Sequence, residues 1–232
     1  QGNPNSFTGD PDSDAEPLLN AGTVGGRALL PMPAGNCTLT PAEAIIGQLV
    51  TLACSNYEPV EYVNVYWGDR TFTSFGMDAN GAGSKTFAVP DKVGGGHTLF
   101  IKGKVSWREA TVGITVLPSI KLANYQGRVG TYVSTSLKGF AAGETIVISW
   151  DDTELRTVTA KSNGGYSFTF DVPGDTAGAH TLTAAGAFSG SVTATYTVVP
   201  SVTLYPTAGK AGDTVTATLR GFSATETLAV KF

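Results

Sequence analysis

Two histidines, His97 and His180, are the only imidazoles in the chain of 232 residues, and imidazole is the side chain best suited to acid–base chemistry near neutral pH. Each lies within the same tripeptide, His-Thr-Leu. Catalysis would require a nucleophile or a second acid–base group in reach, and no Gly-x-Ser-x-Gly motif accompanies either histidine. A histidine duplicated at one place is expected to serve the turn before a strand, so we predict that the chain is not an enzyme.

The two cysteines, Cys37 and Cys54, occupy inward positions of the first two expected strands. If these strands pair antiparallel about a turn centred between Ile45 and Ile46, the two side chains face each other. This predicts a disulfide in an oxidising compartment. The alternative is a pair of buried free thiols that act as small apolar side chains.

Three acidic residues near the N-terminus, Asp10, Asp12 and Asp14, have the alternate spacing of oxygen ligands in a calcium loop. The sixth position of that loop is Ala15 where a sharp turn needs glycine, and the twelfth is Ala21 where a bidentate glutamate is needed. The alternative is a solvated acidic stretch. These residues are a weak calcium candidate, and the sequence predicts no other metal or cofactor.

One glutamate recurs at Glu61, Glu144 and Glu226, each at the start of an expected strand. Hydrolysis by paired carboxylates needs two acids that converge in a cleft, which a lone repeated glutamate does not supply. The better explanation is a carboxylate that accepts hydrogen bonds from a buried loop.

The overall charge bears on the possible partners. The formal net charge is -4, and the 15 basic residues are scattered, which argues against a nucleic-acid partner. No apolar run reaches the length of a bilayer-spanning helix, so no membrane span is predicted in this chain. Hydrophobic residues make up 41% of the sequence, which is enough for buried cores.

A unit of about 80 residues is repeated along the chain. Landmarks recur at one constant spacing, namely Trp67 with Trp150, Asn80-Gly81 with Asn163-Gly164, Val89-Pro90 with Val172-Pro173, and the two histidines. A third copy opens at Ser201 and stops after about three strands. Such a half-sandwich exposes strand edges, so we expect either that the chain continues beyond Phe232 or that a partner supplies the missing strands.

Within the second unit, apolar and hydroxyl side chains alternate with the period of two that is typical of half-buried strands, as in Val192 to Val198. The pattern predicts seven strands, at residues 119–124, 131–138, 144–151, 154–160, 165–172, 179–186 and 191–199. Seven short strands separated by turns indicate an antiparallel β-sandwich.

Several short strings carry a family resemblance: Gly139-Phe140-Ala141-Ala142-Gly143-Glu144, Asn163-Gly164, Val172-Pro173, Ala179-His180-Thr181-Leu182 and Val199-Pro200. In these the chain resembles the tandem immunoglobulin-like repeats of bacterial extracellular and cell-surface proteins. The resemblance implies an all-β fold of tandem seven-stranded sandwiches in a secreted or surface-anchored protein, and it implies no catalytic residues.

The expected organisation has four parts. Residues 1–35 form an extended N-terminal arm, 36–118 and 119–200 form two immunoglobulin-like domains joined end to end, and 201–232 begin a third. Apolar residues of the arm are expected to pack on the first domain or on a neighbouring subunit as an assembly arm; they are Leu18, Leu19, Leu29, Leu30 and Met32.

Two functions follow from this organisation. The first is a structural surface protein, a stalk, layer or filament subunit, that associates with itself or with other surface proteins. The alternative is an adhesin or a carbohydrate-binding region that contacts proteins or glycans through exposed aromatics, with Tyr57, Tyr62 and Trp107 as candidates.

Overall fold

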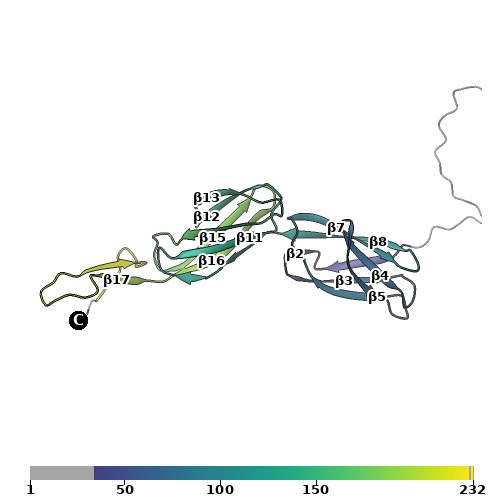
Figure 1. The fold of residues 1–232 in the computed structure, drawn as a ribbon, viewed down its shortest axis with the longest axis horizontal. Helices are drawn as coiled ribbons and strands as arrows, with labels where there is room; N and C mark the ends of the chain where they lie inside the picture. The colour runs from purple at the N-terminus through teal and green to yellow at the C-terminus, as the bar shows by residue number, and fades with distance from the viewer. Residues whose placement is uncertain (1–33, 230, 232) are drawn as a thin grey trace, which may run out of the picture. The chain divides into compact units, whose positions relative to one another are not determined.

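The computed structural model describes residues 34–229 and residue 231, and the regular elements of that part of the chain are β-strands (Figure 1). A first sandwich contains a three-stranded sheet of order β1-β3-β6 and a five-stranded sheet of order β2-β8-β7-β4-β5. Its strands are β1 (Asn36–Thr40), β2 (Glu43–Ile45), β3 (Leu49–Ser55), β4 (Tyr62–Trp67), β5 (Arg70–Gly76), β6 (Gly83–Ala88), β7 (Gly95–Gly103) and β8 (Glu109–Leu117).

The second sandwich repeats this topology, with sheets of order β14-β11-β9 and β10-β16-β15-β12-β13. Its strands are β9 (Ser119–Leu122), β10 (Gln126–Gly127), β11 (Tyr132–Lys138), β12 (Thr145–Trp150), β13 (Thr153–Thr159), β14 (Tyr166–Asp171), β15 (Gly178–Gly186) and β16 (Gly190–Val198). All seven strands that the alternation predicts are present, which confirms the tandem immunoglobulin-like fold.

Within the described residues each sandwich has eight strands, so the expected number of seven is corrected by one. The first strand of each unit divides: β1 and β9 stay in the three-stranded sheet, whereas β2 and β10 pair parallel with the last strand of the other sheet. With only two paired residues, Gln126 and Gly127, β10 is too short for an alternating pattern to be visible in the sequence.

Each sandwich is stabilised by its own hydrophobic core. In β12 the side chains of Ile146, Ile148 and Trp150 are buried, and the residues between them face outward. Tyr196 of β16 is fully buried in the same core. Complete burial of an aliphatic side chain such as Ile148 stabilises the fold by about 1.5 to 3 kcal/mol before entropy costs.

The disulfide prediction is confirmed. Cys37 of β1 lies directly opposite Cys54 of β3 in the antiparallel register, and a disulfide joins them. The second sandwich carries Ile120 and Leu137 at the corresponding paired positions, so there apolar contact replaces the covalent link.

After β16 the chain forms a single antiparallel hairpin of β17 (Ser201–Tyr205) and β18 (Thr216–Arg220). Val202 and Leu204 are about half exposed, because the described residues supply no second sheet to cover them. The expectation of about three strands is corrected to two. The third expected strand would correspond to β12 of the second sandwich, which pairs with β13 on one side and β15 on the other. The described part of this unit contains no counterparts of β13 and β15 with which such a strand could pair.

Some sequence predictions fall outside the described residues. These are the calcium candidates Asp10, Asp12 and Asp14 and the assembly arm residues Leu18, Leu19, Leu29, Leu30 and Met32. Among the residues that are described, no helix has the length and apolar character that crossing a membrane requires.

Candidate functional site

A buried carboxylate connects two loops at one end of the first sandwich. Glu61 is only 4% exposed and precedes β4. Its carboxylate accepts hydrogen bonds from the backbone amides of Glu58 (2.8 Å), Val105 (2.9 Å) and Ser106 (3.0 Å), and from the Ser106 hydroxyl (2.6 Å). The β3–β4 and β7–β8 loops are therefore held against each other.

The second sandwich contains the same arrangement around Glu144. Its carboxylate accepts hydrogen bonds from the amides of Ala141 (2.6 Å), Phe188 (2.8 Å) and Ser189 (3.1 Å), and from the Ser189 hydroxyl. Burial by itself raises the pKa of a carboxyl group, but these hydrogen bonds outweigh it, so the pKa of Glu61 and that of Glu144 both lie below the usual value. The expectation that the repeated glutamate serves a buried loop is confirmed for these two copies.

Both sandwiches should therefore lose stability in acid. A carboxyl group whose pKa is lowered on folding contributes stability above its unfolded pKa of about 4.3, and this is lost as the pH falls through the folded pKa. We expect the free energy of unfolding, measured by denaturant titration from pH 7 to pH 3, to fall less steeply for the Glu61→Gln/Glu144→Gln variant than for the wild type. Parallel curves would contradict a role for these two carboxylates.

The two loops that Glu61 connects also contain two exposed apolar residues with unusual backbone angles. Val60 has φ 62 and is 73% exposed, and Trp107 has φ 58 and is 64% exposed. Left-handed backbone is rare for non-glycine residues, particularly for a β-branched one such as valine, and costs about 1 to 3 kcal/mol at each position. Neither side chain recovers this cost by burial in the sandwich.

The second sandwich shows that the loop geometry itself needs no such residues. Gly143, with φ 74, precedes Glu144 as Val60 precedes Glu61. Gly190, with φ 80, follows Ser189 as Trp107 follows Ser106. Glycine adopts these angles without strain, so valine and tryptophan in the first sandwich replace the residues that folding favours.

Two further exposed residues lie beside them: Tyr62 (57%) is the first residue of β4, and Val105 (67%) is in the β7–β8 loop. The amide of Lys104 donates to the Tyr62 carbonyl at 3.0 Å, and its ammonium group lies 5.7 Å from the Tyr62 ring centroid. Lys102 has its ammonium group 5.2 Å from the Trp107 ring centroid. We call the four residues Val60, Tyr62, Val105 and Trp107 the apolar tip of the first sandwich.

Of the three aromatic residues offered as surface contacts, Tyr62 and Trp107 are exposed and Tyr57 is not. Tyr57 is 3% exposed and occupies the place that the fully buried Phe140 fills in the second sandwich. Burial, with the negative charges of Glu61 and Glu109, raises the pKa of Tyr57 to about 12. The prediction for Tyr57 is therefore wrong, and its correspondence with Phe140 in the repeat was the signal that could have corrected it.

The histidines have the backbone role that their duplication predicts. Nε2 of His97 lies 2.9 Å from the Val93 carbonyl oxygen, and Nε2 of His180 lies 2.9 Å from that of Thr176. Each imidazole thus donates to the turn that precedes its own strand. The duplication gave no indication that His180 also has two carboxylate neighbours, Asp151 and Asp175.

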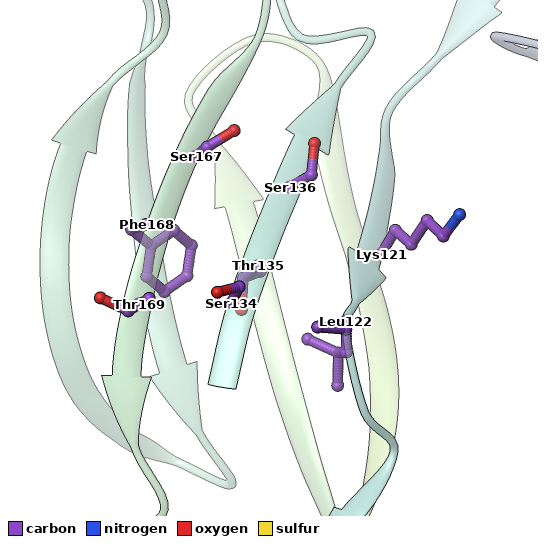
Figure 2. Close-up of a pocket in the computed structure, with 9 residues that line it drawn as sticks. Lys121, Leu122, Ser134, Thr135, Ser136, Ser167, Phe168 and Thr169 are labelled. Carbon is purple, nitrogen blue, oxygen red and sulfur yellow. The ribbon is translucent and has the colours of Figure 1, made fainter. Parts of the chain in front are cut away.

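A shallow hollow lies on the three-stranded sheet of the second sandwich (Figure 2). The polar residues that line it are hydroxyl residues on β11 and β14 and one lysine on β9, namely Ser134, Thr135, Ser136, Ser167, Thr169 and Lys121. No carboxylate or imidazole is among its lining residues, so this hollow holds no acid–base pair.

The fold and the two cores define the class of the protein: it has tandem immunoglobulin-like β-sandwiches. No protein-family model matches the chain, and no curated protein matches it.

Among solved structures, the chain is similar to the D0-D1 domain of intimin, with 11% identity over 71% of this chain and 100% of that one and a TM-score of 0.31. It is also similar to the Yersinia pseudotuberculosis adhesin InvE, with 15% identity over 75% of this chain and 61% of InvE and a TM-score of 0.36. The human OSCAR ligand-binding domain is 14% identical over 72% of this chain and 99% of its own, with a TM-score of 0.30.

Proposed function

We propose that this chain is part of an extracellular adhesin-type protein that binds a partner protein through the apolar tip of its first sandwich. The observation that carries the proposal is the placement of Val60 and Trp107 at left-handed positions where the second sandwich has glycine. Strained residues that persist without helping the fold are typical of ligand contacts. The Cys37–Cys54 disulfide fits the oxidising environment outside the cytoplasm.

The composition of the tip favours a protein partner over a glycan. Trp107 and Tyr62 are the residue types most enriched among binding hot spots, and Val60 and Val105 add aliphatic surface beside them. The ammonium groups of Lys102 and Lys104 lie over the Trp107 and Tyr62 rings, which leaves less aromatic face for a sugar ring. An apolar patch on a protein surface is the complementary partner.

In this proposal the second sandwich acts as a spacer. At the positions of Val60 and Trp107 it carries Gly143 and Gly190, and a single residue, Pro118, separates its first strand from the last strand of the first sandwich. A proline link restricts the backbone of its neighbours. The stalk function that the repeat suggests is thus assigned to the second sandwich, which lacks the apolar tip.

Replacing Trp107 by glycine should weaken binding without harming the fold. The full chain is applied to an array of purified extracellular-matrix and cell-surface proteins and to a glycan array, and the affinity for each bound protein is then measured. We expect Trp107→Gly to weaken binding about 30-fold, as loss of a hot spot of about 2 kcal/mol would. The matched control is Phe188→Ser, which alters an exposed aromatic on the equivalent loop of the second sandwich and should leave binding unchanged.

Each other outcome would overturn the proposal. Binding to glycans only would make the tip a carbohydrate site, and loss of self-association in Trp107→Gly, seen by analytical ultracentrifugation, would make it an assembly contact. Protein binding that survives Trp107→Gly would place the contact elsewhere.

A separate prediction concerns stability. Val60→Gly relieves the left-handed strain of a β-branched residue, worth about 1 to 2 kcal/mol, but gives the unfolded chain more entropy, worth about 0.4 to 1 kcal/mol. We therefore expect the free energy of unfolding of the first sandwich to stay constant or rise by about 1 kcal/mol, as measured by denaturant titration. A clear loss of stability would show that Val60 serves the fold.

A further inference from the structure

Three side chains that could bind a metal converge in the second sandwich. Asp151 lies in the β12–β13 turn, Asp175 in the β14–β15 loop, and His180 on β15. Nδ1 of His180 is 2.9 Å from Oδ2 of Asp151 and 3.5 Å from Oδ2 of Asp175. One ligand atom from each residue lies within 4.8 Å of the other two. An imidazole nitrogen and two carboxylate oxygens are thus gathered in one place, and Nδ1 of His180 forms a hydrogen bond with Oδ2 of Asp151 there.

The other polar atoms of these three residues are also held by hydrogen bonds. Oδ1 of Asp151 accepts from the Thr181 amide at 2.8 Å, and Oδ1 of Asp175 accepts from the Thr176 amide at 2.8 Å. Nε2 of His180 lies 2.9 Å from the Thr176 carbonyl, which orients the ring so that Nδ1 faces the carboxylates. Such supporting bonds are what fixes the ligands of a metal site in proteins.

The first sandwich has the histidine but lacks the two acids. His97 makes the same Nε2 contact, to the Val93 carbonyl, and Gly68 and Lys92 stand at the positions of Asp151 and Asp175. The neighbouring indoles differ accordingly. Nε1 of Trp150 donates to Oδ2 of Asp175 at 3.4 Å, whereas Nε1 of Trp67 is buried without a hydrogen-bond partner among the described residues. The acids are therefore specific to the second unit and are not required by the fold.

We infer that Asp151, Asp175 and His180 bind a divalent late transition-metal ion, zinc in the first instance. His180 is only 8% exposed, and its Nδ1 has two carboxylate oxygens as neighbours, so a positive charge between them is favourable. A proton can fill this role in the metal-free chain, and the ion would displace it to solvent. Mixed imidazole and carboxylate ligands suit zinc, nickel and copper rather than magnesium or calcium.

The spacing agrees with this assignment. Ligand atoms about 2.1 Å from a tetrahedral zinc ion are separated by about 3.4 Å. The two separations from Nδ1, 2.9 and 3.5 Å, are already close to that value. Asp151 is exposed in a turn, so its Oδ2 can turn toward Asp175 while Oδ1 keeps its bond to the Thr181 amide. The ion would clamp the β12–β13 turn and the β14–β15 loop to β15, independently of the proposed tip interaction.

Trp150 provides a local reporter, because its ring stacks on that of His180 with centroids 5.2 Å apart and an angle of 19° between the planes. Zinc is titrated into the full isotope-labelled chain, and the indole N–H resonances of Trp150 and Trp67 are followed by NMR. We expect a saturable shift of the Trp150 resonance at one ion per chain and an unchanged Trp67 resonance.

The test becomes specific for the two acids when each is replaced by the residue at the equivalent position of the first sandwich. Asp151→Gly and Asp175→Lys should each weaken zinc binding at least tenfold, and His97→Gln should not change it. Asp151→Gly is safe for folding because Asp151 has φ 45, an angle that glycine adopts readily. The inference is overturned if millimolar zinc leaves the Trp150 resonance unmoved, if both indoles respond alike, or if both Asp variants bind as the wild type does.

Discussion

Replacing Glu144 by alanine should lower the free energy of unfolding of the second sandwich by about 3 to 4 kcal/mol, since three backbone amides and one hydroxyl lose a charged acceptor. Glu144 is only 2% exposed, so water cannot readily replace the carboxylate. The loss is smaller than the sum of four hydrogen bonds, because the alanine variant no longer has to remove a charged carboxylate from water when it folds. Differential scanning calorimetry, in which the two sandwiches can unfold as separate transitions, measures the effect.

Two matched variants separate the buried carboxylate from general effects. Asp152→Ala removes an exposed acid from the β12–β13 turn and should change stability by less than about 0.5 kcal/mol. Glu61→Ala should destabilise the first sandwich by a similar amount to Glu144→Ala, because the same set of donors surrounds it. A loss below about 1 kcal/mol for Glu144→Ala would mean that these loops are held together by other contacts.

Removing the disulfide should have the second large effect. Cys37 and Cys54 are 17 residues apart, and a link that closes a loop of this size stabilises a protein by about 3 kcal/mol in the chain-entropy model. The Cys37→Ala/Cys54→Ala variant should therefore unfold its first sandwich at a melting temperature lower by about 12 °C or more. Replacing both cysteines avoids the free thiol that a single substitution would leave.

The second sandwich serves as the internal control for this experiment. It carries Ile120 and Leu137 at the equivalent paired positions, so its transition should not move in the variant or when the wild type is treated with a reducing agent. Reduction should lower the first transition as the double substitution does. An unchanged first transition in both cases would show that the strand pairing of β1 with β3 alone is sufficient.

The sequence by itself determined the architecture of this protein. Strand alternation has a period of two, and the internal repeat allowed each strand to be checked against its copy, so the sandwich class followed from local patterns. The same reasoning placed Cys37 opposite Cys54, because the antiparallel register of two strands fixes which of their residues face each other. The histidine contacts and the role of Glu61 and Glu144 could also be inferred from their duplication.

Only the tertiary structure decided where the candidate sites lie. The left-handed angles of Val60 and Trp107 depend on loops that are far apart in the sequence and that Glu61 brings together. The meeting of Asp151, Asp175 and His180 depends on how a turn, a loop and a strand come together at one place. Backbone angles and long-range side-chain contacts are products of packing, and the alternation of apolar and polar residues contains no information on them.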